Sequence, residues 1–240
     1  MLFQRDKWLQ YRMLHSVPLL AERLPETQLL EKESLTNMLQ HYPGLVLKPC
    51  NGSYGRDIVF IERQRSNTYR IQNENQTITL LNTDQLLEWL DKSYKDRTYI
   101  VQQRLHLARI RNKPFDLRIM VQRKKEAPSK WKVTGAYAKV ASRGYLVTNV
   151  ASRTMPALKA LQLARVGGRT LLVQAERTAL LAAKQLAEHN PDLRQVGFDI
   201  GIDQKARIWI IEGNYRPDLR PFRRMKDSSM YRRILWYQKH

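Results

Sequence analysis

The sequence contains a single cysteine, few glycines and no long hydrophobic run. Cys50 cannot form a disulfide within these 240 residues, and no CxxC or Cys/His set accompanies it to suggest a thiolate metal site. No segment approaches the roughly 18 consecutive apolar residues of a membrane-spanning helix, and the first ten residues are charged where a signal peptide is apolar. We therefore expect a soluble, intracellular (cytoplasmic) protein with no membrane partner.

Acidic residues are scarce relative to basic ones. The sequence has 22 Asp and Glu residues against 42 Lys and Arg residues, a formal net charge of +20, and residues 104–125 and 216–239 carry much of the excess. Such a charge favours an acidic partner, which could be nucleic acid, an acidic polypeptide or a phosphorylated polymer, while a solvated basic face would have the same composition. The sequence lacks an RRM, KH or zinc-finger signature, so nucleic acid is the least favoured partner.

The hydrophobic pattern predicts an α+β protein. Helical periodicity occurs around Trp8–Leu20 and in the segments EKESLTNMLQHY, TDQLLEWLDKSY, ALKALQLA and LLVQAERTALLAAKQLAEHN. Pro25 and Thr27 mark an expected loop. Strand-like runs are LVLK, DIVFIE, NTYRIQ, QTITLL, RTYIVQQRL, FDLRIMVQRK, KWKVTGAYAKV, FDIGID and ARIWIIEGN. Strands and helices in clusters favour antiparallel sheets over a parallel doubly wound sheet.

Two of the ten glycines, Gly52 and Gly55, lie in the strand-loop-strand segment VLKPCNGSYGRDIVF. Glycines allow backbone amides to approach phosphate oxygens closely, and Lys48 on the preceding strand supplies a positive charge for the same phosphates. The segment is not a Walker A motif, which would continue into a helix through GK[ST]. An ordinary hairpin turn is the alternative.

The segment FDIGIDQKARIWIIEGN predicts a hairpin that carries two carboxylates. A four-residue loop at 203–206 would place Asp199 opposite Ile210 and Gly197 opposite Glu212, so that Asp199 and Glu212 are diagonal neighbours on one face. Asn214 follows two residues later. Two carboxylates and an amide oxygen are hard ligands that suit Mg²⁺, whereas solvated acidic residues at the two ends of a hairpin are the alternative.

A third candidate segment is FDLRIMV, in which Asp116 and Arg118 share one face of a strand. Arg118 can bind a phosphate through its planar guanidinium, or the two residues can form an ordinary surface ion pair. Lys139 and Asn149, in YAKVASRGYLVTN, are weaker candidates.

Taken in order, the segments DKW, LPET, VLKPCNGSYG, YIVQQRL, FDLRIMV, YAKVASRGYLVTN, GFDIGID and WIIEGN resemble the ATP-grasp superfamily, specifically the YheC/YheD-type family associated with endospore coats. The resemblance spans residues 5 to about 222. It implies one ATP-grasp domain whose two α+β lobes, with antiparallel sheets, enclose the nucleotide. The corresponding ranges are a helical lead-in at about 1–42, lobes at 43–101 and 102–222, and a basic tail at 223–240.

The resemblance also implies a Mg²⁺-ATP site. Lys7 and Lys48 match the phosphate-binding lysines, and the hinge that holds adenine corresponds to Gln102, Gln103, Arg104 and Leu105. The lid over the phosphates corresponds to Asn51, Gly52, Ser53, Tyr54 and Gly55. Arg118 matches the arginine at the γ-phosphate, Lys139 and Asn149 complete the ATP-binding set, and the Mg²⁺ ligands correspond to Asp199, Glu212 and Asn214.

Three features depart from the family pattern. Related enzymes often have arginine in place of Lys139, and a glycine pair soon after Asn149, where this chain continues VASRTMP and has Gly167 and Gly168 only later. Relatives also tend to have a further domain before the DKW segment. The acceptor side of the site is therefore not defined by the resemblance.

The reaction implied is activation of a carboxylate by the γ-phosphate of ATP to give an acyl phosphate, which an amine or another nucleophile attacks. Lys48 and Arg118 would be catalytic, and the basic surface would attract an acidic substrate such as an acidic peptide or a spore-coat component. A non-catalytic ATP-binding coat protein and a nucleic-acid-binding protein are the two alternatives.

Overall fold

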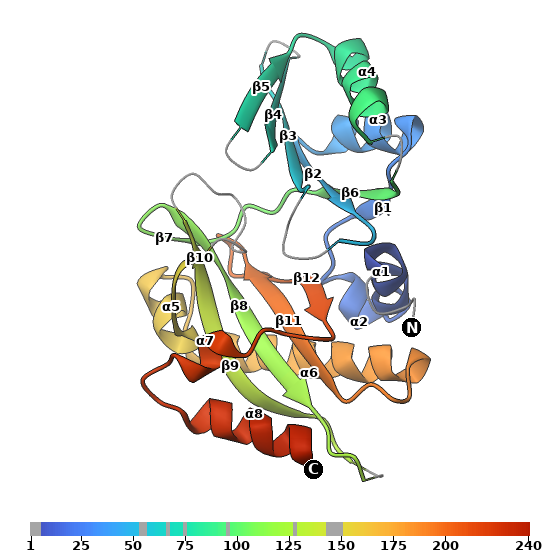
Figure 1. The fold of residues 1–240 in the computed structure, drawn as a ribbon. Coiled ribbons are helices and arrows are strands. Elements are labelled where there is room, and N and C mark those ends of the chain that lie inside the picture. The colour runs from blue at the N-terminus through green and yellow to red at the C-terminus, as the bar shows by residue number, and fades with distance from the viewer. Residues whose placement is uncertain are drawn as a thin grey trace. The chain divides into compact units, whose positions relative to one another are not determined.

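The structure is a computed structural model that describes residues 6–52, 57–65, 68–73, 76–94, 97–126, 129–142 and 151–240 (Figure 1). The described chain forms two compact units. The first unit comprises Met1–Tyr11 and Pro25–Leu105, and the second comprises Arg12–Leu24 and His106–His240. Helix α1 (Lys7–His15) contains the point where the first part of the chain passes from one unit to the other. None of the helices in the described ranges is long and apolar enough to cross a membrane.

The first unit contains a six-stranded antiparallel sheet and two further helices. Its elements are β1 (Thr27–Leu29), α3 (Lys32–His41), β2 (Gly44–Pro49), β3 (Val59–Arg63), β4 (Tyr69–Asn73), β5 (Gln76–Leu80), α4 (Thr83–Tyr94) and β6 (Tyr99–Gln103). The strand order is β1-β6-β2-β3-β4-β5. Because alternate residues of a strand share a face, Leu45, Leu47, Val59 and Ile61 all point into one core. Apolar residues of α3 and α4 close that core.

The second unit contains a larger sheet with the order β10-β9-β8-β11-β12, and β7 pairs with β8. Every strand pair described in it is antiparallel. Its elements are α2 (Pro18–Ala21), β7 (Arg109–Ile110), β8 (Lys113–Gln122), β9 (Lys132–Ala141), β10 (Ala151–Pro156), α5 (Ala157–Leu163), α6 (Arg169–His189), β11 (Gln195–Ile202), β12 (Ile208–Asn214), α7 (Arg220–Arg223) and α8 (Ser229–Lys239).

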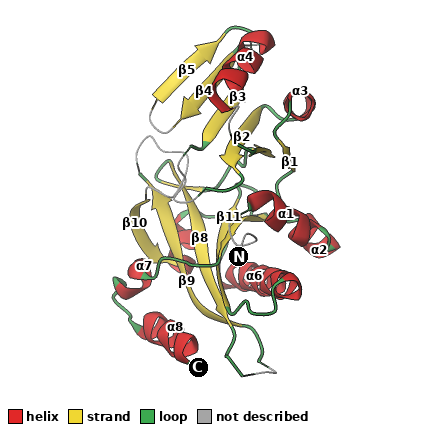
Figure 2. Cartoon of the chain, turned by 45° about the vertical axis from the view of Figure 1, so that its right-hand side comes forward, coloured by secondary structure: helices red, strands yellow, loops and turns green. Residues whose placement is uncertain are grey.

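Helices cover the two faces of this second sheet. Helix α6 packs on one face through a buried stripe that includes Ala175, Ala179 and Leu186, and α7 and α8 pack on the other (Figures 1 and 2). Met120 and Tyr137 of the sheet form a buried cluster with Phe222 of α7 and Ile234 of α8.

The α+β architecture with two antiparallel sheets is confirmed, and three segments differ from the sequence-based expectation. Thr27, expected in a loop, begins β1, which pairs with β6. The 223–240 segment, expected as a basic tail, contains α8, because Met230, Tyr231 and Ile234 give one side of the helix an apolar surface that packs on the sheet. Strand β10 was not expected.

Asp203 closes the turn between β11 and β12. Its carboxylate accepts hydrogen bonds from the backbone amides of Lys205 and Arg207, from the Arg207 guanidinium and from the Trp209 indole. Burial alone would raise the pKa of Asp203, but these donors outweigh burial and lower it. Four donors on one carboxylate fix the conformation of the turn between β11 and β12.

We expect Asp203→Asn to lower the free energy of unfolding by about 2 kcal/mol, because charge-assisted hydrogen bonds are lost. Because the folded-state pKa of Asp203 is lowered, the wild-type advantage is present above about pH 4 and disappears as the pH falls through the folded-state pKa. Thermal unfolding from pH 3 to pH 7 measures this difference. The exposed Asp192→Asn is the matched control, and an equal loss in both variants would contradict the role of Asp203.

Candidate nucleotide and metal site

Several residues predicted to bind ATP gather in the first unit around the end of β2. The Lys48 ammonium donates to the Gln102 side chain at 2.6 Å, Gln102 donates to the Thr27 hydroxyl at 2.8 Å, and Thr27 donates to the carbonyl of Pro25. Lys48, Gln102 and Thr27 are buried. This chain of hydrogen bonds holds the Lys48 ammonium in a defined position.

Lys7 lies beside the glycine-containing loop. Its ammonium donates to the carbonyl of Gly52 at 2.9 Å, its backbone amide donates to Cys50, and Asp6 forms an isolated bridge with Asn51. The structure therefore brings the N-terminal DKW segment against the start of the predicted phosphate loop. Ser53, Tyr54 and Gly55, the rest of that loop, lie outside the described residues.

The hinge residues point in different directions. Gln102 turns toward Lys48. The Arg104 guanidinium lies over the Phe60 ring, with its carbon 5.6 Å from the ring centroid, and 3.5 Å from the Glu62 carboxylate. Gln103 and Leu105 are partly exposed. Adenine binding at the hinge stays a prediction.

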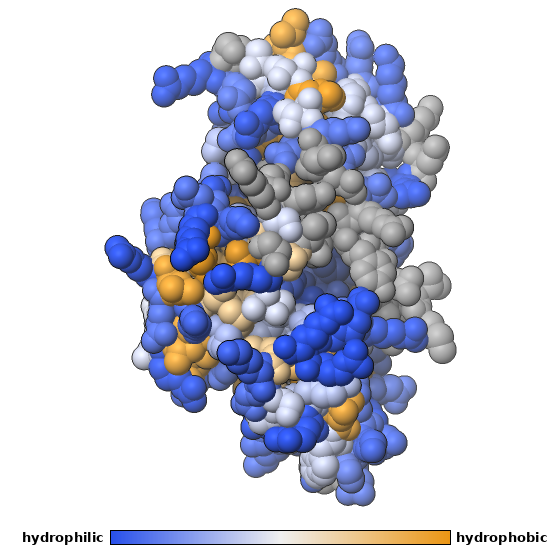
Figure 3. Space-filling model, turned by 60° about the vertical axis from the view of Figure 1, so that its left-hand side comes forward, coloured by the Kyte–Doolittle hydropathy of each residue, from blue (hydrophilic) through white to orange (hydrophobic). Residues whose placement is uncertain are grey.

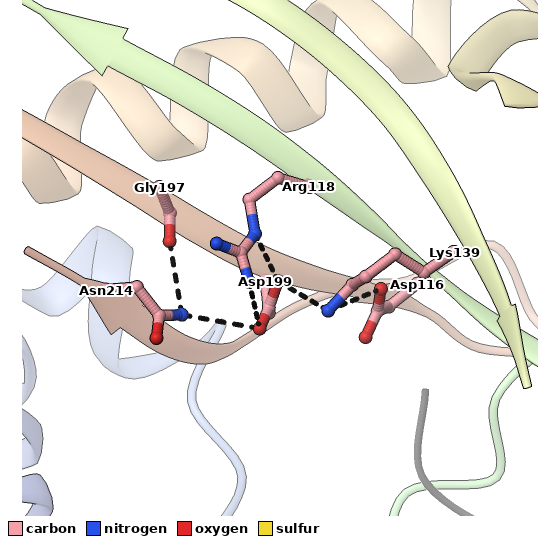
Figure 4. A network of polar contacts seen from close by, with 6 residues as sticks. All are labelled: Asp116, Arg118, Lys139, Gly197, Asp199 and Asn214. Carbon is pink, nitrogen blue, oxygen red and sulfur yellow. Dashed lines mark hydrogen bonds and ion pairs between the residues drawn. The ribbon is translucent and has the colours of Figure 1, made fainter. Parts of the chain in front are cut away.

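The second unit contains a network of buried charges on β8, β9 and β11, which the neutral Asn214 of β12 joins (Figure 4). Arg118 binds Asp199 with two hydrogen bonds, of 2.7 Å from Nε and 3.1 Å from Nη2. Lys139 donates to Asp199 at 2.9 Å and lies 3.3 Å from the Asp116 carboxylate. Asn214 donates to Asp199 and to the carbonyl of Gly197, both at 3.4 Å. A Cβ at Gly197 would approach Pro217 to 2.7 Å, so glycine is needed beside Arg118.

Strand register explains why these side chains meet. Arg118 pairs with Asp199 across β8 and β11, and Asp116 pairs with Lys139 across β8 and β9. Directly paired residues of antiparallel strands point to the same face. That face is opposite the one covered by α6, which lies behind the strands in Figure 4.

Arg118, Lys139 and Asp199 stay ionised because each of these charges has an opposite neighbour. Burial alone would lower the pKa of Arg118 and of Lys139, but the Asp199 and Asp116 carboxylates outweigh burial and raise both. Burial alone would raise the pKa of Asp199, but Arg118 and Lys139 lower it. Asp199 is only 5% exposed, so its charge depends on these two cations.

The predicted register of the β11–β12 hairpin is wrong. In the structure Ile202 pairs with Ile208, and Asp199 pairs directly with Glu212, with a bulge between the two regions. The register at the turn alone would place Ile211 opposite Asp199 and turn Glu212 to the other face. The bulge adds one residue to β12 and brings Glu212 to the same face as Asp199.

The donor set suits a hard cation. Asp199, Glu212 and Asn214 supply two carboxylates and one amide oxygen from adjacent strands, and Mg²⁺ is commonly held by one or two carboxylates together with substrate phosphates. Within the described ranges, no group of three or more His, Cys, Asp and Glu residues gathers as a metal site. The arrangement therefore fits a metal held jointly by protein and nucleotide better than one held by protein alone.

Two participants were missed or misjudged in the sequence. Asp116 was considered only as a partner for Arg118, whereas it lies next to Lys139. Thr27 was assigned to a loop, and only the pairing of β1 with β6 shows that it supports Gln102. Asn149 lies outside the described residues.

The sequence matches a family model described as YheC/D like ATP-grasp over residues 3–240. The chain belongs to this ATP-grasp family. It is 25% identical over 219 residues to the endospore coat-associated protein YheD of Bacillus subtilis (strain 168), a match that covers 88% of this chain and 48% of that protein. This ATP-grasp chain spans about half the length of the curated relatives it matches.

Solved structures confirm the ATP-grasp fold. D-alanyl-alanine synthetase A from Vibrio cholerae superimposes with a TM-score of 0.56 at 13% identity, covering 99% of this chain and 61% of that one. The ATP-grasp ligase PsnB, complexed with a phosphomimetic variant of minimal precursor, Mg and ADP, gives 0.55 at 14% identity, covering 97% and 57%. At these identities the likeness shows the fold alone.

We expect Cys50 to be unreactive in the folded protein. The side chain is buried, and burial raises the pKa of its thiol to about 11, so the nucleophilic thiolate is scarce at pH 8. Labelling with an aromatic disulfide should be slow in native buffer and fast in denaturant. Native labelling at the rate of a free cysteine would contradict this assignment.

We expect Asp199→Asn to destabilise the second unit by about 3–5 kcal/mol, because two buried cations lose their shared counter-charge. The control is Asp91→Asn, which breaks the exposed pair with Lys32 and should cost less than about 1 kcal/mol. Calorimetric unfolding measures both effects. Similar losses in the two variants would show that the buried network is not the source of stability.

Proposed function

We propose that this protein is an ATP-dependent ligase that joins a carboxylate to an amine or another nucleophile through an acyl phosphate. The observation that carries the proposal is the direct pairing of Asp199 with Glu212 beside two buried cations, Arg118 and Lys139, in a chain of the ATP-grasp family. Opposite charges within reach of one ligand suit both a divalent cation and the phosphates that it accompanies.

Asp199, Glu212 and Asn214 would hold Mg²⁺, and Lys7, Lys48, Arg118 and Lys139 would bind phosphate oxygens. Bound Mg²⁺-ATP would supply a γ-phosphoryl group to the substrate carboxylate, with ADP as the leaving group, before the nucleophile displaces phosphate from the acyl carbon. The fixed position of Lys48 supports this role, because a preorganised positive charge stabilises negative charge without a cost of reorganisation.

Arg118 and Lys139 have a second use for their charge. In the structure both neutralise Asp199. Were a metal ion held at Asp199, Arg118 and Lys139 would be available to neutralise phosphate oxygens instead. Their burial strengthens this interaction, because charges interact more strongly where water is excluded.

The carboxylate substrate would be acidic, since the chain carries a net charge of +20. A spore-coat component as substrate fits the names of the relatives. We also propose that the protein is cytoplasmic and associates with the coat. The residues that bind the nucleophile are not part of it.

Thermal-shift titration with Mg²⁺-ATP tests the nucleotide and metal assignments. A ligand at 100 times its Kd stabilises the folded state by about 2.7 kcal/mol, so millimolar nucleotide should raise the wild-type melting temperature by several degrees. Glu212→Gln keeps the shape of the side chain but removes one ligand charge, and its shift should largely disappear.

Glu188→Gln, an exposed change of the same kind on α6, is the control and should keep the full shift. Absence of a wild-type shift at millimolar Mg²⁺-ATP would overturn the proposed function. Equal shifts in wild type and Glu212→Gln would overturn the metal assignment only.

A further inference from the structure

The net positive charge is confined to one of the two units. The first unit has 12 Lys and Arg residues against 11 Asp and Glu residues, which leaves it nearly neutral. The second has 30 against 11, a net charge of +19. Solubility alone does not require such a separation, because a basic surface spread over the whole chain would serve equally well.

Part of this charge forms a strip along the segment from β12 through α7 to α8. Its members are exposed and form no ion pair with other described residues, and we call the following set the C-terminal strip: Arg216, Arg223, Arg224, Lys226, Arg232 and Arg233. At the end of α8, Lys124 lies over the Trp236 ring and the amide of Lys125 donates to His240, so the β8–β9 turn continues the strip.

The strip adjoins the buried charge network of the second unit. Asp116, Arg118 and Met120 are alternate residues of β8 and share one face of the strand. Asp116 and Arg118 belong to the network, and Met120 packs under α7 and α8. Arg118 and Met120 are therefore about 7 Å apart along one strand face. Tyr137, which pairs with Arg118, packs edge-to-face on Phe222 of α7. Figure 3 shows that hydrophobic side chains form separate patches within a mostly hydrophilic face of the molecule.

Helices α7 and α8 are held firmly enough to present this charge in a fixed pattern. Phe222 and Ile234 are fully buried, and a Cβ at Gly135 of β9 would approach the Phe222 ring to 2.7 Å, so glycine lets the ring sit directly on the sheet. Arg223, Arg232 and Arg233 thus project from helices that are packed on the sheet. Arg232 and Arg233 attract Asp227 without forming an ion pair with it, so the described residues of the strip keep an excess of exposed cations that suits an external anion.

The distribution of the cations favours an extended polyanion over a small anion. The strip runs over 18 residues of chain, on two helices and the segments beside them, so its six cations can offer several separate contacts to an extended anionic chain. The nearby aromatic rings already have partners, since Trp236 stacks on His240 and contacts Lys124, and the Trp131 ring carries Arg123. Base stacking on single-stranded nucleic acid requires a free ring face, so these rings favour an acidic polypeptide over a single strand.

We propose that the C-terminal strip is the docking surface for an acidic polypeptide. Its Asp and Glu side chains bind the exposed arginines, and the rim of the buried network lies within reach of the same chain. The docking depends only on the second unit and needs neither ATP nor Mg²⁺. That this polypeptide also carries the carboxylate to be activated rests on the proposed function.

Fluorescence anisotropy with a labelled peptide tests the docking. The probe is a peptide of about 15 residues in which Glu alternates with Gly, long enough to span roughly 50 Å when extended. The test variant changes four cations of the strip to Gln: Arg223→Gln, Arg224→Gln, Arg232→Gln and Arg233→Gln. The control removes the same charge from the side of the unit formed by α5 and α6: Lys159→Gln, Arg165→Gln, Arg177→Gln and Lys184→Gln.

We expect wild type to bind in the absence of ATP, the strip variant to bind about tenfold more weakly, and the control variant to change by less than about twofold. Raising the salt from about 50 mM to about 500 mM should abolish wild-type binding. All substituted positions are exposed, and circular dichroism confirms that each variant is folded.

Equal losses in the two variants would show attraction to net charge alone and would overturn the proposal. Tighter binding of a single-stranded or duplex oligonucleotide of the same total charge than of the peptide would overturn it in favour of nucleic acid. Because no nucleotide is present, a negative result here leaves the Mg²⁺-ATP titration unaffected, and a negative titration leaves the docking result unaffected.

Discussion

Four charged side chains of the second unit lie on a sheet face from which water is almost fully excluded, and each depends on an opposite charge. Asp199 accepts from both Arg118 and Lys139, and Lys139 also lies beside Asp116. A buried ion without its partner costs several kcal/mol, so the strands that carry these residues must keep their register. The same constraint fixes Asp199, Arg118 and Lys139, three of the residues proposed to bind Mg²⁺-ATP.

Much of the fold follows from local sequence pattern. The alternation of apolar residues in β3 and β4 and the helical stripe of α6 each point to a single element, because burial of one face decides both. Short segments, and segments that mix apolar with charged residues, do not show such a clear pattern. Strand β1 is three residues long, and α8 lies in a segment whose excess of basic residues was interpreted as a tail, although Met230, Tyr231 and Ile234 share one side of the helix.

The candidate site was less predictable, for a geometric reason. That Asp199 and Glu212 belong to one hairpin follows from the order of apolar and polar residues, but their direct pairing depends on a bulge that no local preference announces. In the same way, Asp116 and Lys139 are far apart in sequence, and only the β8–β9 register brings them together. Residue types indicate which chemical groups the chain supplies, whereas the pairing of distant strands decides which of these groups lie together.

The bulge in β12 makes the chain unusually sensitive to changes in length. Between Ile208 and Glu212, a substitution alters one side chain, but a gain or loss of one residue would exchange the faces of everything that follows, placing Glu212 and Asn214 against the hydrophobic side of the sheet. Among relatives of this chain, the segment should therefore accept many different apolar residues while its spacing stays constant. Spacing, more than residue identity, would then mark the members that keep Asp199, Glu212 and Asn214 on one face.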